Sequence, residues 1–124
     1  MLFRFGPEDL HGVRILIVED EAYLAADLAE ALRARGATVI GPAATLDEAY
    51  RAVASHWIDR AVLDVNLDGE MSFPLIDRLE AAGIPYVIAT GYAAEALPER
   101  FRGKPRLEKP YRAEALALLM AGTG

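Results

Sequence analysis

The chain contains 124 residues, which is the length of one ordinary domain and is enough to bury a hydrophobic core. Hydrophobic residues make up 53% and charged residues 26% of the sequence, a balance that is typical of a folded protein and excludes a disordered one. The net charge of −6 argues against nucleic acid or an anionic membrane as the main partner, and the absence of cysteine excludes disulfides, thiolate metal sites and cysteine nucleophiles. No segment approaches the roughly 20 apolar residues of a membrane span, so we expect a soluble, cytoplasmic protein.

The first half of the chain alternates short apolar runs with helical patterns. Leu24, Leu28 and Leu32 recur at the spacing of one helix face. Further on, Thr45 and Glu48 have the spacing of a capping box at the start of a helix. In chain order, the sequence predicts an N-terminal leader (1–12), a strand (13–18), a helix (21–35), a strand (37–40) and a helix (45–55).

The second half continues the same alternation until it reaches a weak fourth helix. Pro98, Gly103 and Pro105 interrupt residues 93–105, which predicts at most one or two helical turns there. Ser72 is expected to cap the third helix. In chain order, the predicted elements are a strand (60–65), a turn (66–71) with Asp68-Gly69, a helix (72–83), a strand (85–90), a short or irregular fourth helix, a strand (106–108) and a helix (112–121).

Five strands alternating with helices predict an α/β fold, a doubly wound five-stranded parallel sheet with helices on both faces. Such a sheet binds its ligand beyond the carboxyl ends of its strands. Chemistry is therefore expected where the predicted strands end.

Four of the five predicted strands end in polar residues of a particular kind. Glu19 and Asp20 follow the first strand and Asp64 the third. Thr90 follows the fourth strand and Lys109 the fifth. Three clustered carboxylates repel one another, so the cluster needs a cation, and oxygen ligands suit Mg²⁺. A divalent ion, a carboxylate nucleophile, a hydroxyl and an ammonium together indicate transfer of a phosphoryl group to an aspartate.

At these residues the sequence resembles the receiver domain of two-component response regulators. The matching motifs occur in the family's order, and the resemblance covers about residues 13–121. They are the acidic pair Glu19-Asp20, the acceptor Asp64, Thr90-Gly91 and Lys109-Pro110. The resemblance implies the flavodoxin-like strand order 2-1-3-4-5.

Residues 88–92 (Ile-Ala-Thr-Gly-Tyr) further resemble a subgroup of receivers with Phe-Ala-Thr-Gly-X-Tyr at this place, many of which are single-domain proteins. In this chain, Ile88 replaces the Phe, and Tyr92 directly follows Gly91. The resemblance implies a stand-alone receiver with no output domain.

The resemblance also implies a role for each site residue. Asp64 would be the phosphoacceptor, and Thr90 and Lys109 would contact the phosphoryl group. Mg²⁺ would be held by Glu19, mainly through water, by Asp20, by Asp64 and by the backbone carbonyl of Asn66. Access and switching would involve Gly91, Tyr92 and Pro110, although Tyr92 as simple core filler stays equally open. The peptide bond before Pro110 is often cis in receivers.

The function implied is a phosphorylatable switch in a phosphorelay, not mainly an enzyme. A histidine kinase or a phosphotransfer protein would donate the phosphoryl group, and a downstream protein would respond, with a homodimer through the last helix as an alternative.

Two other functions stay in view. Residues 64–68 superficially resemble the motif of Mg²⁺-dependent aspartyl-nucleophile phosphohydrolases of the haloacid dehalogenase type, but Asn66 stands where those enzymes have an acid/base Asp. A structural pseudo-receiver would lack Asp64, Thr90 or Lys109, and this chain keeps all three.

Overall fold

A computed structural model describes residues 9–122, so residues 1–8 of the predicted leader lie outside the described residues. Within that range, no helix is long and apolar enough to cross a membrane. The strands are β1 (Arg14–Val18), β2 (Thr38–Ala43), β3 (Arg60–Leu63), β4 (Asn66–Leu67), β5 (Glu70–Met71), β6 (Tyr86–Thr90) and β7 (Arg106–Glu108). The helices are α1 (Ala22–Ala34), α2 (Leu46–Ser55), α3 (Phe73–Ala81), the 3₁₀ turn η1 (Ala94–Ala96), α4 (Glu99–Arg102) and α5 (Ala113–Ala121).

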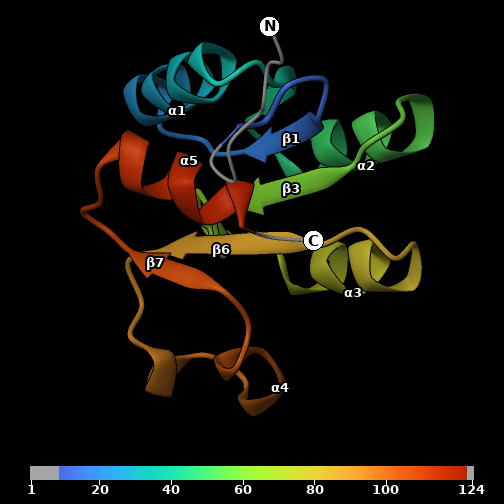
Figure 1. The fold of residues 1–124 in the computed structure, drawn as a ribbon. Helices are drawn as coiled ribbons and strands as arrows, with labels where there is room; N and C mark the ends of the chain where they lie inside the picture. The colour runs from blue at the N-terminus through green and yellow to red at the C-terminus, as the bar shows by residue number, and fades with distance from the viewer. Residues whose placement is uncertain (1–8, 123–124) are drawn as a thin grey trace, which may run out of the picture.

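The main sheet has the order β2-β1-β3-β6-β7, and every pair of neighbours in it is parallel. β6 and β7 are the fourth and fifth strands of this sheet, so the predicted order 2-1-3-4-5 is confirmed. The arrowheads of β1, β3 and β6 point the same way, so their carboxyl ends lie at one edge (Figure 1). This edge is where the candidate site forms.

Successive side chains along each central strand point to opposite faces of the sheet, so the core is divided into two clusters, one on each face. In β1, Ile15 and Ile17 belong to one buried cluster, which includes side chains of α1 and α5. Leu16 and Val18 belong to the other cluster, which includes side chains of α2, α3 and α4. Because each central strand is buried on both faces, it is apolar along most of its length, with polar residues only at its ends, namely Arg14 in β1, Arg60 in β3 and Thr90 in β6.

The fourth helix is short, as the proline and glycine pattern predicts. It consists of the turn η1 and of α4, with Pro98 at the N-cap position of α4. Phe101 is buried and stacks on Phe73 at the start of α3, with 5.3 Å between the ring centroids. One aromatic contact therefore fixes the short element against α3.

Residues 66–71 form a small antiparallel hairpin, β4–β5, where the sequence predicts a turn. Asp68 has a φ of 51° and Gly69 a φ of 92°. Two consecutive residues with positive φ are typical of a tight hairpin turn, so the predicted Asp68-Gly69 turn is confirmed. The hairpin extends the loop after β3 beyond the main sheet.

The second strand is longer than predicted, because it continues through Gly41 and Pro42 to Ala43. Gly41 has a φ of 93°, and a Cβ atom there would lie 2.7 Å from the Ala43 nitrogen. Only glycine fits this bend. The pairing register with β1 shifts at this point, so the bend is a bulge-like irregularity in an edge strand.

The end of the predicted leader packs onto the domain. Leu10 is fully buried in the cluster under α1 and α5, and its N–H donates to the carbonyl of Arg35. Residues from Asp9 onward are thus part of the folded unit.

Candidate functional site

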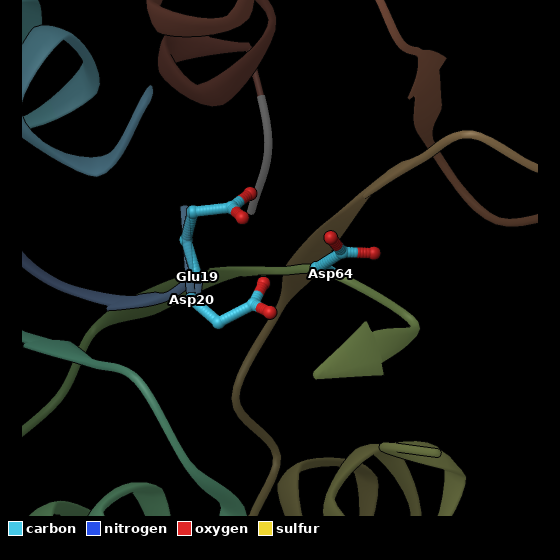
Figure 2. A group of neighbouring side chains, drawn as sticks. All are labelled: Glu19, Asp20 and Asp64. Atoms are coloured by element: carbon cyan, nitrogen blue, oxygen red, sulfur yellow. The ribbon is translucent and has the colours of Figure 1, made fainter. Parts of the chain in front are cut away.

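Three carboxylates meet at the carboxyl edge of the sheet. Glu19 and Asp20 directly follow β1, and Asp64 directly follows the adjacent parallel strand β3. One oxygen from each carboxylate lies within 4.8 Å of the others. Figure 2 shows the three side chains beside one another, Glu19 and Asp20 on consecutive residues and Asp64 on the neighbouring strand end. Glu19 and Asp64 are buried, so their mutual repulsion is weakly screened by water.

The ammonium group of Lys109 lies against this acidic cluster. Its Nζ atom is 2.7 Å from Asp64 Oδ2 and 3.0 Å from Glu19 Oε1. The backbone N–H of Lys109 donates to the Thr90 carbonyl at 2.7 Å, which brings the end of β7 beside the end of β6. Glu21 Oε2 lies 3.4 Å from the same Nζ, a contact that the sequence analysis missed.

The protonation of the ion pair follows from burial and charge together. Burial alone would lower the pKa of Lys109, but hydrogen bonds and charges from Asp64 and Glu19 outweigh burial and hold this pKa above its usual value. Burial raises the pKa of Glu19, although the Glu21 N–H and Lys109 partly offset this effect. Lys109 is therefore a fixed positive charge at neutral pH.

Both carboxylate oxygens of Asp64 have a donor. Oδ2 accepts from Lys109, and Oδ1 accepts from the backbone N–H of Asn66 at 3.1 Å. The carboxylate is consequently held in one orientation, which is what a positioned nucleophile requires.

A chain of neutral hydrogen bonds connects the loop after β3 with the loop after β6. The Asn66 side-chain amide donates to the Tyr92 hydroxyl at 3.1 Å, and the Asn66 Oδ1 atom accepts from the Gly69 N–H at 2.6 Å. The backbone N–H of Tyr92 in turn donates to the buried Thr90 hydroxyl oxygen at 3.0 Å. This bond uses the oxygen of Thr90 and leaves its O–H able to donate.

These groups border one open pocket. Thr90 and Glu19 do not line it. Pro110 instead lines a neighbouring cavity with Tyr23 and Tyr111, and the Lys109-Pro110 peptide bond is cis. The residues that line the pocket are Asp20, Glu21, Asp64, Asn66, Asp68, Gly69, Gly91, Tyr92 and Lys109.

The donor set at this edge fits a hard divalent cation. Three carboxylates with oxygens within 4.8 Å of one another face a single lysine ammonium, so net negative charge remains to be compensated. Oxygen ligands of this kind suit Mg²⁺. The cluster therefore has the composition that the sequence predicts for a metal site.

Ser72 is a further residue whose place at the site the sequence analysis missed. It stands at the N-cap position of α3, as predicted, but its side chain accepts no capping hydrogen bond. Instead its hydroxyl donates to the backbone carbonyl of Asp64 at 2.6 Å. The capping signal in the sequence located the residue and gave the wrong partner.

Comparisons with known proteins agree on one family. A family model described as the response regulator receiver domain matches residues 15–117. The solution structure of SdrG from Sphingomonas melonis Fr1 is 39% identical, with a TM-score of 0.78, and the match covers 90% of this chain and 95% of that one.

Two further relatives share part of their length with this chain. A response regulator from Burkholderia pseudomallei, solved with a phosphorylated aspartic acid, calcium ion and citrate, is 26% identical with a TM-score of 0.75, over 87% of this chain and 66% of that chain. The transcriptional regulatory protein PdtaR of Mycobacterium tuberculosis is 33% identical over 90 residues, which are 72% of this chain and 44% of PdtaR. The chain thus spans less than half the length of PdtaR.

Proposed function

Because this chain belongs to the response regulator receiver domain family, we propose that it is a signalling switch that accepts a phosphoryl group on Asp64. The donor is a histidine kinase or a phosphotransfer protein, the reaction requires Mg²⁺, and the phosphorylated form is recognised by a downstream protein. The observation that carries this proposal is the contact between Asp64 and Lys109 inside a cluster of three carboxylates.

The transfer step needs a positioned nucleophile and groups that hold the phosphoryl oxygens. An oxygen of Asp64 attacks the phosphorus of the donor, a P–O bond forms as the P–N bond of the donor's phosphohistidine breaks, and the departing imidazole takes up a proton from solvent. Lys109, already at the Asp64 carboxylate, pairs with a phosphoryl oxygen. Thr90 donates its free O–H to another oxygen of the group.

The metal would be held by Asp20, Asp64 and the backbone carbonyl of Asn66, with Glu19 acting mainly through water. When bound, a divalent cation neutralises part of the charge that accumulates as the phosphoryl group meets the carboxylates. The acidic cluster supports this ligand set, and the Burkholderia relative was solved with a calcium ion and a phosphorylated aspartic acid.

Asn66 and Tyr92 would control how long the phosphoryl group persists. Their hydrogen bond lies across the pocket that contains the acceptor, so it restricts the path of an attacking water. Gly91, which has no side chain, leaves room beside Tyr92 for the phosphoryl group. We also assign the chain to the Phe-Ala-Thr-Gly-X-Tyr subgroup, on the basis of residues 88–92.

The site does not favour a turnover phosphohydrolase. Asn66 stands two positions after the nucleophile, and a carboxamide does not transfer protons as an acid/base carboxyl does. Both ends of its amide are also engaged, with Gly69 and Tyr92. A slow switch is consistent with that arrangement.

The test is labelling of the full chain with acetyl phosphate and Mg²⁺, measured by intact mass. Wild type should gain one phosphoryl group, and Asp64→Asn should gain none. Asp68→Asn is the matched control, because Asp68 lines the same pocket but occupies the hairpin turn, and this variant should label like wild type. Equal labelling of Asp64→Asn and wild type would show that the acceptor lies elsewhere.

A further inference from the structure

Ser72 connects the acceptor to helix α3 through every polar group that it has. It is fully buried, and its single O–H donates to the Asp64 carbonyl at 2.6 Å, with the Val65 carbonyl as a second, longer contact at 3.2 Å. Its backbone N–H donates to the Val65 carbonyl at 2.8 Å. Its own carbonyl accepts the N–H groups of Leu75 and Ile76, which begin the hydrogen bonding of α3.

The Asp64 carbonyl needs such a donor because it lies just beyond the end of the sheet. β3 ends at Leu63, and the Asp64 N–H still donates to the Val18 carbonyl of β1 at 3.0 Å. The next carbonyl, that of Asp64, is met by the Ser72 hydroxyl. A buried carbonyl deprived of its donor is costly, and the surrounding backbone turns to recover one.

The orientation of this carbonyl affects a hydrogen bond that holds the acceptor side chain. The carbonyl belongs to the peptide unit that joins Asp64 to Val65, so turning this unit shifts the backbone that follows, including the Asn66 N–H that donates to Asp64 Oδ1. The carboxylate keeps its two contacts, with Lys109 at 2.7 Å and with the Asn66 N–H at 3.1 Å, only in a narrow range of orientations.

We propose that Ser72 is a positioning residue for phosphoryl transfer: its buried hydroxyl fixes the backbone of Asp64 and thereby aims the carboxylate at the incoming phosphorus. This inference rests on the proposed function of Asp64 as acceptor. Ser72 does not touch the phosphoryl group and acts through the backbone alone.

The test compares single-turnover labelling of full-length variants by acetyl phosphate at saturating Mg²⁺. Ser72→Ala should lower the maximal labelling rate on the order of tenfold, since small displacements of a reacting group are costly, and should leave the half-saturating acetyl phosphate concentration unchanged. Ser72→Cys, which keeps the size and a weak donor, should lie between wild type and Ser72→Ala.

Ser55→Ala is the matched control. The Ser55 hydroxyl also donates to a backbone carbonyl, that of Arg51, at 2.6 Å, but at the exposed end of α2. This variant loses the same kind of bond far from Asp64 and should label at the wild-type rate. A rate lowered as much as that of Ser72→Ala would overturn the proposal.

Thermal unfolding separates positioning from a purely structural role, with all rates measured well below the lowest unfolding midpoint. A lower midpoint together with a wild-type rate for Ser72→Ala would overturn the proposal. If Ser72→Ala does not fold, Ser72→Cys decides: a reduced rate supports positioning and an unchanged rate overturns it. If wild type does not label, or if Asp64→Asn labels equally, the proposed function is overturned and this inference with it. If wild type and Ser72→Ala label at equal rates, only this inference is overturned.

Discussion

The pocket has two halves that are built from different interactions. On one side Asp20 and Lys109 line the pocket and interact through charge with the buried Glu19. On the other side Asn66 and Tyr92 interact through neutral hydrogen bonds that join two loops. Coulomb attraction acts over several ångströms and tolerates small shifts, whereas a hydrogen bond weakens steeply with distance and angle. Under the proposed function, the charged half would decide whether a phosphoryl group can be accepted, and the neutral half would decide how long the acceptor stays modified.

The largest expected effect comes from the charged half. Asp20→Asn removes one of three carboxylates that would hold the metal, so it should weaken Mg²⁺ binding and slow labelling by acetyl phosphate on the order of tenfold or more. Labelling time courses across a Mg²⁺ titration measure both effects. Asp47→Asn, an exposed acid on α2, should change neither. Unchanged labelling in excess chelator would remove the metal from the proposal.

A smaller effect is expected from the neutral half. Tyr92→Phe removes the hydroxyl that accepts from Asn66, so it should shorten the acyl-phosphate half-life by about fivefold, the equivalent of one net hydrogen bond. The labelling rate should stay within about twofold of wild type, because this hydroxyl makes no contact with Asp64. Decay of the phosphorylated mass after removal of acetyl phosphate measures the half-life.

The control for that experiment is Tyr23→Phe, which alters a tyrosine on α1 that is 91% exposed. Equal decay of wild type and Tyr92→Phe would contradict the assignment of persistence to the neutral half.

The segment between Tyr92 and Lys109 connects the two halves along the chain. Tyr92 belongs to the neutral half and Lys109 to the charged half. This segment contains the short α4, which is fixed to α3 by the stack of Phe101 on Phe73 and by the pairing of Arg100 with Asp77. Closure of Thr90 and Lys109 on a phosphoryl group should be absorbed here, because short helices are regions of low local stability.

Hydrogen exchange with and without a phosphoryl mimic such as beryllofluoride tests this expectation. The largest protection change outside the pocket should fall between residues 92 and 109. Strong protection of residues 92–109 both with and without the mimic would contradict this expectation.

The smallest expected effect is on stability, and it concerns a hydrogen bond outside the pocket that joins a neutral phenol to a charged carboxylate. The Tyr86 hydroxyl donates to Glu80 Oε2 at 2.6 Å. Burial, followed by the interaction with Glu80, raises the pKa of Tyr86 above its usual value. This tyrosine therefore contributes stability that is fully present below about pH 10, where the unfolded phenol titrates, and that is lost as the pH rises through the folded pKa.

Urea unfolding at about pH 8 and about pH 11 measures this contribution. The stability advantage of wild type over Tyr86→Phe should shrink at the higher pH, while Tyr23→Phe should follow wild type at both. An advantage that grows with pH would show that the sign is wrong.

The charged half could be predicted from the sequence because its residues stand at the ends of predicted strands. The apolar runs before Glu19 and Asp64 and the short predicted strand before Lys109 place these residues at one edge once the strands are parallel, and parallel strands follow from the alternation with helices. The short fourth helix was equally predictable, since proline and glycine act locally. The position of the charged half and the short fourth helix both follow from local sequence signals and the order of the elements, without any knowledge of side-chain geometry.

Other details of the site and of the fold could be predicted only in part. Ser72 carries a capping signal, but its hydroxyl donates to the Asp64 carbonyl, because the β4–β5 hairpin folds the chain between these two residues back on itself. Glu21 reaches Lys109 through a side-chain conformation that no spacing rule specifies. The strand predicted at 37–40 stops too early, because glycine and proline usually end a strand and here form a bend within it.

That bend in β2 has a consequence for how copies of the protein meet at high concentration. β2 is one edge of the sheet, and Pro42 in it has no N–H with which to pair another strand. The opposite edge, β7, has three residues, two of which are the charged Arg106 and Glu108. Neither edge is a good template for growth of the sheet into a neighbouring molecule, so the domain is protected against edge-to-edge aggregation. Copies that do associate are expected to meet through their helices.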